Sequence, residues 1–126
     1  MPLTVDMMKR SEKIVVITPK GRIDAETNEI FQNKMTDALR SCPETIVIDM
    51  EDVYYINSSG LGTILSAYRE LKKHNGHIIL THLQPQIKKV FDVLKALPAR
   101  AIFENMKEVD KYFEAIQSGD ISDQTQ

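Results

Sequence analysis

The residue types best suited to chemistry lie in one short segment, residues 57–62, which reads Asn-Ser-Ser-Gly-Leu-Gly. Its two adjacent serines stand at a predicted strand-to-helix junction, where helix N–H groups point outward and the helix dipole favours negative charge. Gly60 and Gly62 fall in the predicted first turn, where each glycine costs about 0.5–1 kcal/mol relative to alanine. Close approach by another backbone or by a partner would offset that cost. The simplest alternative is that Asn57 or Ser58 only caps the helix, which is worth about 1 kcal/mol.

The same segment does not match the known serine- and phosphate-based catalytic motifs. A nucleophile elbow needs a glycine two residues before the serine, and neither serine has one. A P-loop needs Gly-Lys-Ser/Thr, whereas Thr63 follows Gly62. A phosphate-accepting aspartate at Asp49 or Asp52 would want an acidic pair after an early strand, which residues 16–19 lack. We therefore expect no catalytic residue and no enzyme activity.

Metal and cofactor sites are not expected either. His74 and His77 are three residues apart, but a predicted helix break separates them, so a metal set with Cys42 and His82 is a weak alternative. The acidic cluster in residues 49–52 is more simply a solvated loop than a cation site.

Composition narrows the class of protein. The 126 residues include 16 Lys+Arg and 18 Asp+Glu, so the formal charge is −2, and this mixed charge argues against nucleic-acid binding. No apolar run approaches the roughly 18 residues that a membrane helix needs, and the first 13 residues do not read as a signal peptide. One cysteine, Cys42, cannot form an internal disulfide. These features predict one cytoplasmic domain without membrane or nucleic-acid partners.

The elements that must position the serines follow from hydrophobic periodicity. Apolar residues alternate from Leu3 to Met7, and a β-branched run at residues 14–17 forms a second strand that Pro19 and Gly21 should end. The other expected elements are a helix at 25–40 with Asp24 as N-cap, a strand at 45–50, a helix from the serine segment to about 74, a strand at 77–81, helical stripes at 87–94 and 106–116, and a candidate edge strand at 101–103.

This order predicts an α/β fold with a mixed sheet, because strands alternate with helices after an opening hairpin. The domain is expected to cover residues 1–117, and the polar residues 118–126 are expected to form a disordered tail. In the apolar run before the serines, Tyr54 and Tyr55 should point to opposite faces of an extended chain.

The sequence resembles the STAS-domain proteins of the bacterial anti-sigma factor antagonist type. The resemblance lies in residues 21–25 (Gly-Arg-Ile-Asp-Ala), 46–53 (Ile-Val-Ile-Asp-Met-Glu-Asp-Val) and 56–62, with further agreement at 76–80 and 90–94. It implies a single STAS-like domain with a mixed four- to five-stranded sheet and about four helices.

The resemblance also implies a switch protein. In that family an unphosphorylated antagonist binds an anti-sigma factor that is also a serine kinase, and a PP2C-type serine phosphatase reverses the phosphorylation. The phosphorylated residue would here be Ser58, with Ser59 as the alternative, and the protein would be a monomer when free. The partner-binding residues implied are Asp24, Asn57, Ser58, Ser59, Gly60, Leu61, Gly62 and Thr63.

Two functions remain open from the sequence. The intact Ser-Ser-Gly favours a phosphorylation-switched binding module, whereas Asn57, where the family usually has Asp, favours a STAS adaptor or scaffold that is not phosphorylated. In the first case Gly60→Val should leave the fold intact and block the partner. The exposed side of the following helix, with Thr63, Ser66, Ala67 and Glu70, should complete the docking surface.

Overall fold

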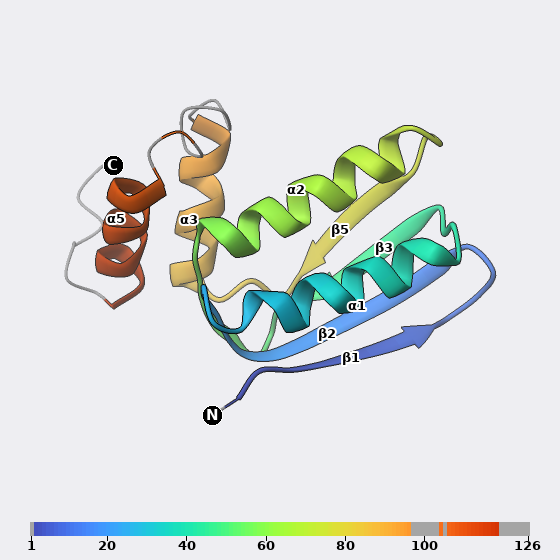
Figure 1. The fold of residues 1–126 in the computed structure, drawn as a ribbon, viewed down its shortest axis with the longest axis horizontal. Helices are drawn as coiled ribbons and strands as arrows, with labels where there is room; N and C mark the ends of the chain where they lie inside the picture. The colour runs from blue at the N-terminus through green and yellow to red at the C-terminus, as the bar shows by residue number, and fades with distance from the viewer. Residues whose placement is uncertain (1, 97–103, 105, 119–126) are drawn as a thin grey trace.

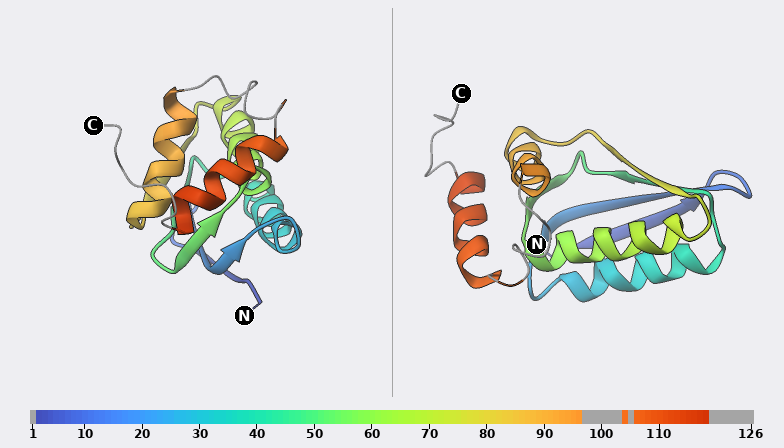
Figure 2. Two further views of the ribbon diagram at one scale, coloured as in Figure 1. Left: turned by 90° about the vertical axis from the view of Figure 1, so that its left-hand side faces the viewer. Right: turned by 90° about the horizontal axis from the view of Figure 1, so that it is seen from above.

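The computed structural model describes residues 2–96, 104 and 106–118. Within them a mixed five-stranded sheet is combined with four helices, which confirms the predicted fold class. Helices α1 and α2 lie side by side on one face of the sheet, and α3 and α5 gather at one end of the molecule (Figures 1 and 2). The elements are β1 (Thr4–Lys9), β2 (Ile14–Ile23), α1 (Asn28–Arg40), β3 (Thr45–Asp49), β4 (Val53–Ile56), α2 (Ser58–Lys72), β5 (His77–Thr81), α3 (Pro85–Ala96) and α5 (Met106–Ser118).

Strand β2 is the longest strand and organises the sheet. It pairs antiparallel with β1, parallel with β3 through residues 14–17, and parallel with β4 through residues 21–23. The expectation that Pro19 and Gly21 end this strand is wrong. Pro19 lies between the two parallel ladders, where its missing N–H costs less, and Gly21 takes a φ of 125° beside a register shift. The strand therefore continues to Ile23 and reaches the start of α2.

The core forms between the sheet and the pair α1 and α2. Alternate residues of β2 and β3 are buried, as the β-branched pattern predicts, and the helices contribute one apolar stripe each. Its fully buried large side chains include Ile17, Ile46, Ile48, Phe31, Met35 and Leu61.

The boundaries of α1 and α2 can be explained by the residues at their ends. Helix α1 begins at Asn28, not at residue 25, because residues 25–27 form a turn before the helix. Helix α2 begins at Ser58 and ends at Lys72, and Asn75 then takes the left-handed conformation with a φ of 60°. Gly76 follows because a Cβ there would lie 2.7 Å from the carbonyl oxygen of Glu44.

Three other expectations concern the tyrosine pair, the C-terminal segments and membrane-spanning helices. Tyr54 is 46% exposed and Tyr55 is 8% exposed, so the two do point to opposite faces of β4. The candidate strand at 101–103 lies outside the described residues, as does the expected tail apart from Ser118, which ends α5. Among the helices that the structure describes, none has the length and apolar character to cross a membrane.

Candidate functional site

Asn57, one of the two residues that the sequence offered as a cap, is the N-cap of α2. Its backbone is extended, with φ −110° and ψ −176°, and its Oδ1 accepts a hydrogen bond of 3.1 Å from the N–H of Gly60. The Asn57 N–H donates to the carbonyl of Ile23, which ties the cap to the end of β2. The first turn of α2 contains no acidic residue, so the helix carries no negative group of its own at this end.

The two serines differ sharply in exposure. Ser58 is 0% exposed, and its Oγ has no hydrogen-bond partner in the part of the chain that the structure describes. Its backbone N–H donates a 2.8 Å hydrogen bond to Oδ1 of Asp110 in α5. Ser59 is only half-buried. The structure therefore seats a buried, unsatisfied hydroxyl at the N-terminus of α2 and places an accessible one next to it.

Gly60 is packed inside the domain. A Cβ at this position would lie 2.7 Å from Cγ2 of Ile23 and 2.8 Å from Cγ1 of Ile56, and both isoleucines are fully buried. The close approach that offsets the cost of the glycine is thus made by the sheet beneath α2. The expectation that Gly60→Val leaves the fold intact is therefore wrong.

Several other residues expected to bind a partner also have internal roles. Leu61 is 0% exposed and belongs to the core. Thr63 is 6% exposed, and its Oγ1 donates a 3.0 Å hydrogen bond to Oδ1 of Asn28, which joins α2 to the start of α1. Gly62 and Asp24 are half-buried and remain, with Ser59, the members of that set that solvent reaches most easily.

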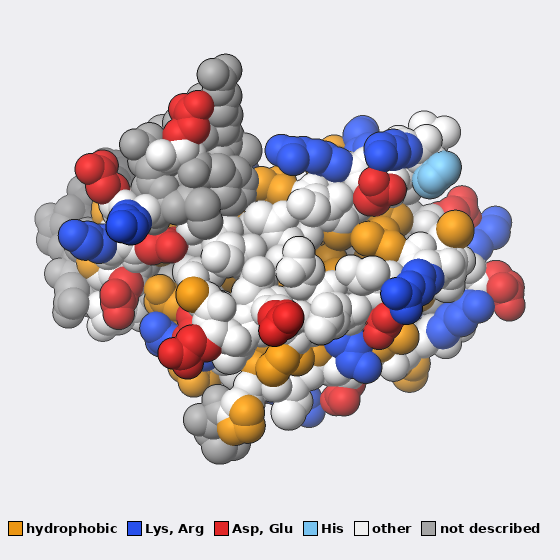
Figure 3. Space-filling model, viewed as in Figure 1, with side chains coloured by type: hydrophobic (Ala, Val, Ile, Leu, Met, Phe, Trp, Pro, Cys, Tyr) orange, Lys and Arg blue, Asp and Glu red, His pale blue; other side chains and the backbone are white. Residues whose placement is uncertain are grey.

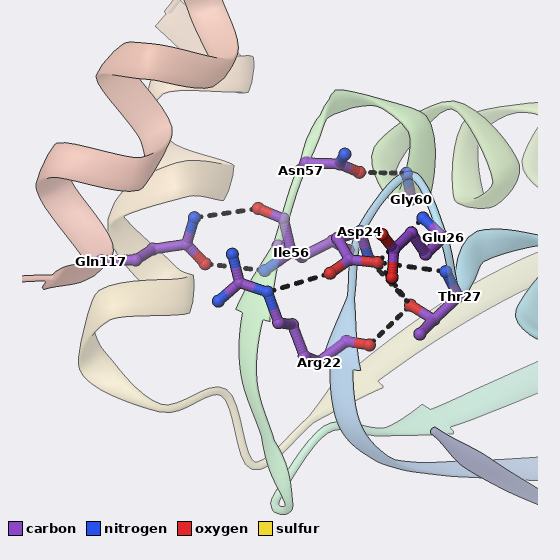
Figure 4. A network of polar contacts seen from close by, with 8 residues as sticks. All are labelled: Arg22, Asp24, Glu26, Thr27, Ile56, Asn57, Gly60 and Gln117. Atoms are coloured by element: carbon purple, nitrogen blue, oxygen red, sulfur yellow. Dashed lines mark hydrogen bonds and ion pairs between the residues drawn. The ribbon is translucent and has the colours of Figure 1, made fainter. Parts of the chain in front are cut away.

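Arg22 contacts both Asp24 and Tyr55 beside the serine segment, and Figure 4 shows its ion pair with Asp24. Arg22 and Tyr55 are register partners on β2 and β4, and the guanidinium carbon lies 3.7 Å from the centre of the Tyr55 ring. Arg22 Nε also donates to Oδ2 of Asp24 at 3.0 Å. Burial raises the pKa of the Tyr55 hydroxyl, Arg22 opposes the rise, and Glu114 and Asp110 of α5 add to it.

Asp24 caps the turn that precedes α1. Its Oδ1 accepts hydrogen bonds of 3.0 Å from the N–H groups of both Glu26 and Thr27, and the Thr27 hydroxyl donates to the carbonyl of Arg22 (Figure 4). Burial raises the pKa of the Asp24 carboxyl, but the hydrogen bonds from Thr27, Arg22 and Glu26 outweigh burial and hold the pKa below its usual value. The prediction that Asp24 is the N-cap of α1 is therefore wrong, because Thr27 holds that position and Asp24 stabilises the turn that precedes it.

The lowered pKa of Asp24 gives a pH-dependent prediction. A carboxyl whose folded pKa lies below its ordinary value of 3.8 stabilises the fold above that value, and the contribution is lost as the pH falls through the folded pKa. Asp24→Asn should cost about 0.5–1 kcal/mol at pH 7, and the gap to the wild type should be smaller at pH 3, which lies below the ordinary pKa of the carboxyl. Urea unfolding at both pH values measures it, with Asp37→Asn, from an exposed ion pair with Arg40, as the control. A gap that is equally large at both pH values would contradict the assignment.

Helix α5 brings a further polar group to the site. The side-chain amide of Gln117 accepts a 2.8 Å hydrogen bond from the N–H of Ile56 and donates a 2.9 Å hydrogen bond to the carbonyl of the same residue (Figure 4). Sequence reasoning treated α5 only as an apolar stripe and so missed Asp110 and Gln117. The sequence feature that could have revealed them is their spacing of seven residues, which places both on the helix face that carries Phe113.

The expected remainder of the docking surface has a definite shape. Thr63, Ser66, Ala67 and Glu70 form one wall of a groove of about 110 Å³, and α1 forms the other wall. Ser66 and Glu70 are exposed as expected, but the expectation is wrong for Thr63 and Ala67, which are buried. The α1 residues that line the groove are Gln32, Met35, Thr36 and Leu39. Apolar side chains are visible at the surface between the two helices in Figure 3.

One cluster of metal-ligating groups lies away from the serines. Ligand atoms of Asp49, Glu51 and His82 lie within 4.8 Å of one another at the end of β3. Oδ1 of Asp49 already accepts a hydrogen bond from the Glu51 N–H and lies 3.0 Å from Nδ1 of His82. Asp49 thus already has internal partners, and the cluster includes none of the residues of the serine segment.

Comparison with known proteins identifies the family to which this fold belongs. The family model described as "STAS domain" matches residues 7–109. The anti-sigma F factor antagonist of Lysinibacillus sphaericus is 32% identical over 92 residues, which cover 72% of this chain and 77% of that protein. The anti-sigma factor antagonist SpoIIAA in its unphosphorylated form has a similar structure, with a TM-score of 0.61 and 29% identity over 71% of this chain and 82% of that one.

The Bacillus cell fate determinant SpoIIAA in its phosphorylated form is equally similar, with a TM-score of 0.61 and 28% identity over the same shares, 71% and 82%. The family match covers most of the chain and includes β2, β4 and the whole serine segment. The chain therefore belongs to the STAS domain family.

Proposed function

We propose that this chain is an anti-sigma factor antagonist that binds a serine kinase with anti-sigma activity and is released when Ser58 is phosphorylated. The observation that carries the proposal is the Ser58 hydroxyl, which lies without a hydrogen-bond partner in the described structure at the N-terminus of α2. A relative of similar fold has been solved in phosphorylated and unphosphorylated forms, which supports a switch of this kind.

The reaction would be an ordinary phosphoryl transfer. Ser58 Oγ attacks the γ-phosphorus of ATP bound to the kinase, the bond to the β–γ bridging oxygen breaks, and ADP leaves. The hydroxyl proton passes to a base of the kinase. A PP2C-type phosphatase would reverse the step by hydrolysis, which regenerates the serine and releases inorganic phosphate. This chain supplies only the accepting hydroxyl, so its role is that of a regulatory binding module in the cytoplasm.

The N-terminus of α2 is a suitable place for a phosphate. Backbone N–H groups at a helix N-terminus and the helix dipole both stabilise negative charge. The first turn has no acidic residue, and the cap at Asn57 is neutral, so neither would repel a phosphate within α2 itself. We therefore expect phosphorylation to leave the sheet and α2 folded and to act on the partner surface.

A second candidate function is a STAS adaptor that is never phosphorylated. The complete burial of Ser58 favours it, since a kinase cannot reach this hydroxyl while the domain keeps the described conformation. Asn57 favours it as well, because it completes the cap without a charge that could take part in a switch.

Phosphosite mapping distinguishes the two functions. The purified chain, Ser58→Ala and Ser59→Ala are each incubated with ATP and lysate from the organism of origin, and mass spectrometry locates the phosphate. Phosphate on Ser58 that is lost only in Ser58→Ala is the expected result. Phosphate that is lost only in Ser59→Ala would move the site by one residue. No phosphate on any form, in a lysate that phosphorylates a control antagonist, would favour the adaptor.

A further inference from the structure

We propose that helix α5 is a detachable cover over Ser58, so that seating of α5 and phosphorylation of Ser58 exclude each other. The proposal rests on the proposed function for the role of Ser58. It concerns what controls access to that residue, which the family assignment does not address. Besides its packing against α3, helix α5 makes three kinds of contact near the start of α2, and these bring it next to a hydroxyl that a kinase would have to reach.

The first contact is electrostatic. Oδ1 of Asp110 accepts the 2.8 Å hydrogen bond from the Ser58 N–H, so a carboxylate from α5 occupies the N-terminus of α2. The first turn of α2 has no acid of its own. Asp110 thus supplies the negative group that this helix end favours, and it lies where a phosphate on Ser58 would compete for the same N–H groups.

The second contact satisfies the free edge of β4. This strand pairs with β2 on one side, and the Gln117 side chain takes both backbone groups of Ile56. The side-chain amide thus makes the two hydrogen bonds that a neighbouring strand would otherwise make with Ile56. Since unpaired backbone groups at a strand edge can bind a strand or a side chain from a partner, the N–H and carbonyl of Ile56 are available for docking once α5 leaves, whereas the Tyr54 carbonyl keeps its hydrogen bond from Gln86 of α3.

The third contact is apolar and involves only one face of α5. Phe113 is 0% exposed and Ile116 is 7% exposed, and both lie on the face of α5 that carries Asp110 and Gln117. The opposite face is open to solvent, as the exposed Lys111 and other polar residues show. Helix α5 is therefore attached by a single face, with the polar pair placed directly over Ser58 and Ile56.

These contacts make the two states of Ser58 incompatible. With α5 seated, Ser58 is fully buried, so the in-line approach of ATP to its Oγ is blocked. A phosphate on that Oγ would stand beside the Asp110 carboxylate, and two anions at such a distance repel each other. Release of α5 therefore comes before phosphorylation, and phosphorylation prevents its return.

Thiol labelling tests the cover without any kinase. In a Cys42→Ser background, which removes the exposed native thiol, Ser58→Cys and Ser59→Cys are each treated with DTNB. We expect the thiol at position 58 to react at least tenfold more slowly than the thiol at position 59. Equal rates would overturn the proposal, because they would show that α5 does not protect the site.

Variants in α5 test whether the polar pair holds the cover. Asp110→Ala/Gln117→Ala should accelerate labelling at position 58 about tenfold, whereas the control Glu108→Ala/Lys111→Ala, on exposed positions of the same helix, should not change it. An unchanged rate in the first double variant would overturn the proposal.

Hydrogen exchange repeats the test with Ser58 intact, in case cysteine disturbs the packing there. In Asp110→Ala/Gln117→Ala the amides of Ile56 and Ser58 should lose protection, while that of Ile48 in β3 keeps it. Equal loss at Ile48 would mean global unfolding and would contradict a detachable cover. Neither measurement involves phosphate. They can therefore contradict the detachable cover even if Ser58 is phosphorylated, and they can support the cover even if Ser58 is not phosphorylated.

Discussion

Phosphorylation of Ser58 is expected to lower the affinity of this chain for the proposed anti-sigma partner about a hundredfold, which corresponds to about 2.7 kcal/mol. The unphosphorylated hydroxyl is small and neutral, whereas the phosphate carries about −1.5 to −2 charges and must be desolvated in any interface that covers it. The loss should appear mainly as faster dissociation, because in the proposed interface the phosphate would be a buried charge and not a charge at the rim.

Calorimetric titration of the purified kinase measures this effect. The stoichiometrically phosphorylated chain is compared with the unphosphorylated chain, and Ser58→Ala serves as the control that lacks both the phosphate and the hydroxyl. Ser58→Ala should bind within about threefold of the unphosphorylated chain, because it introduces no charge. Equal affinities of the two phosphorylation states would contradict the switch and leave the adaptor as the better reading.

Much of the fold follows from local patterns. The turn of the opening hairpin and the helical stripes were predictable because each depends on the period of apolar residues. The end of β2 was not, because proline interrupts a strand only where its missing N–H is needed for pairing. In this sheet the parallel partner changes between these residues, from β3 to β4, and sequence alone does not reveal that change.

The site was predictable only in part, for a related reason. The Asn57 cap and the placement of Ser58 at the start of α2 are local features, and the sequence predicts both. The burial of Ser58 is not local, because Asp110 reaches it from 52 residues away along the chain. Contacts of that kind depend on how α5 packs against the rest of the domain. The apolar stripe of a helix does not determine which polar side chains of that helix will contact α2 or β4.

Gly60 shows how a residue that looks functional can owe its identity to packing. Gly60→Val is expected to destabilise the fold by about 3 kcal/mol or more, because a Cβ would already stand 2.7 Å from Ile23 and 2.8 Å from Ile56. Two further methyl groups add to the overlap. Neither isoleucine can withdraw easily, since both are fully buried between the sheet and the helices.

Urea unfolding of Gly60→Val, Gly60→Ala and the wild type measures the effect, with Ser66→Val as the control for a β-branched residue at an exposed position of α2. Gly60→Ala should lose about 1–3 kcal/mol despite the better helix propensity of alanine, and Ser66→Val should lose less than about 0.5 kcal/mol. A normal unfolding midpoint for Gly60→Val together with lost partner binding would return Gly60 to the interface. The expected order of stability instead places the need for glycine in the contact between α2 and the strands beneath it. By that contact Ile23 and Ile56 set how close the helix, and with it Ser58, lies to the sheet.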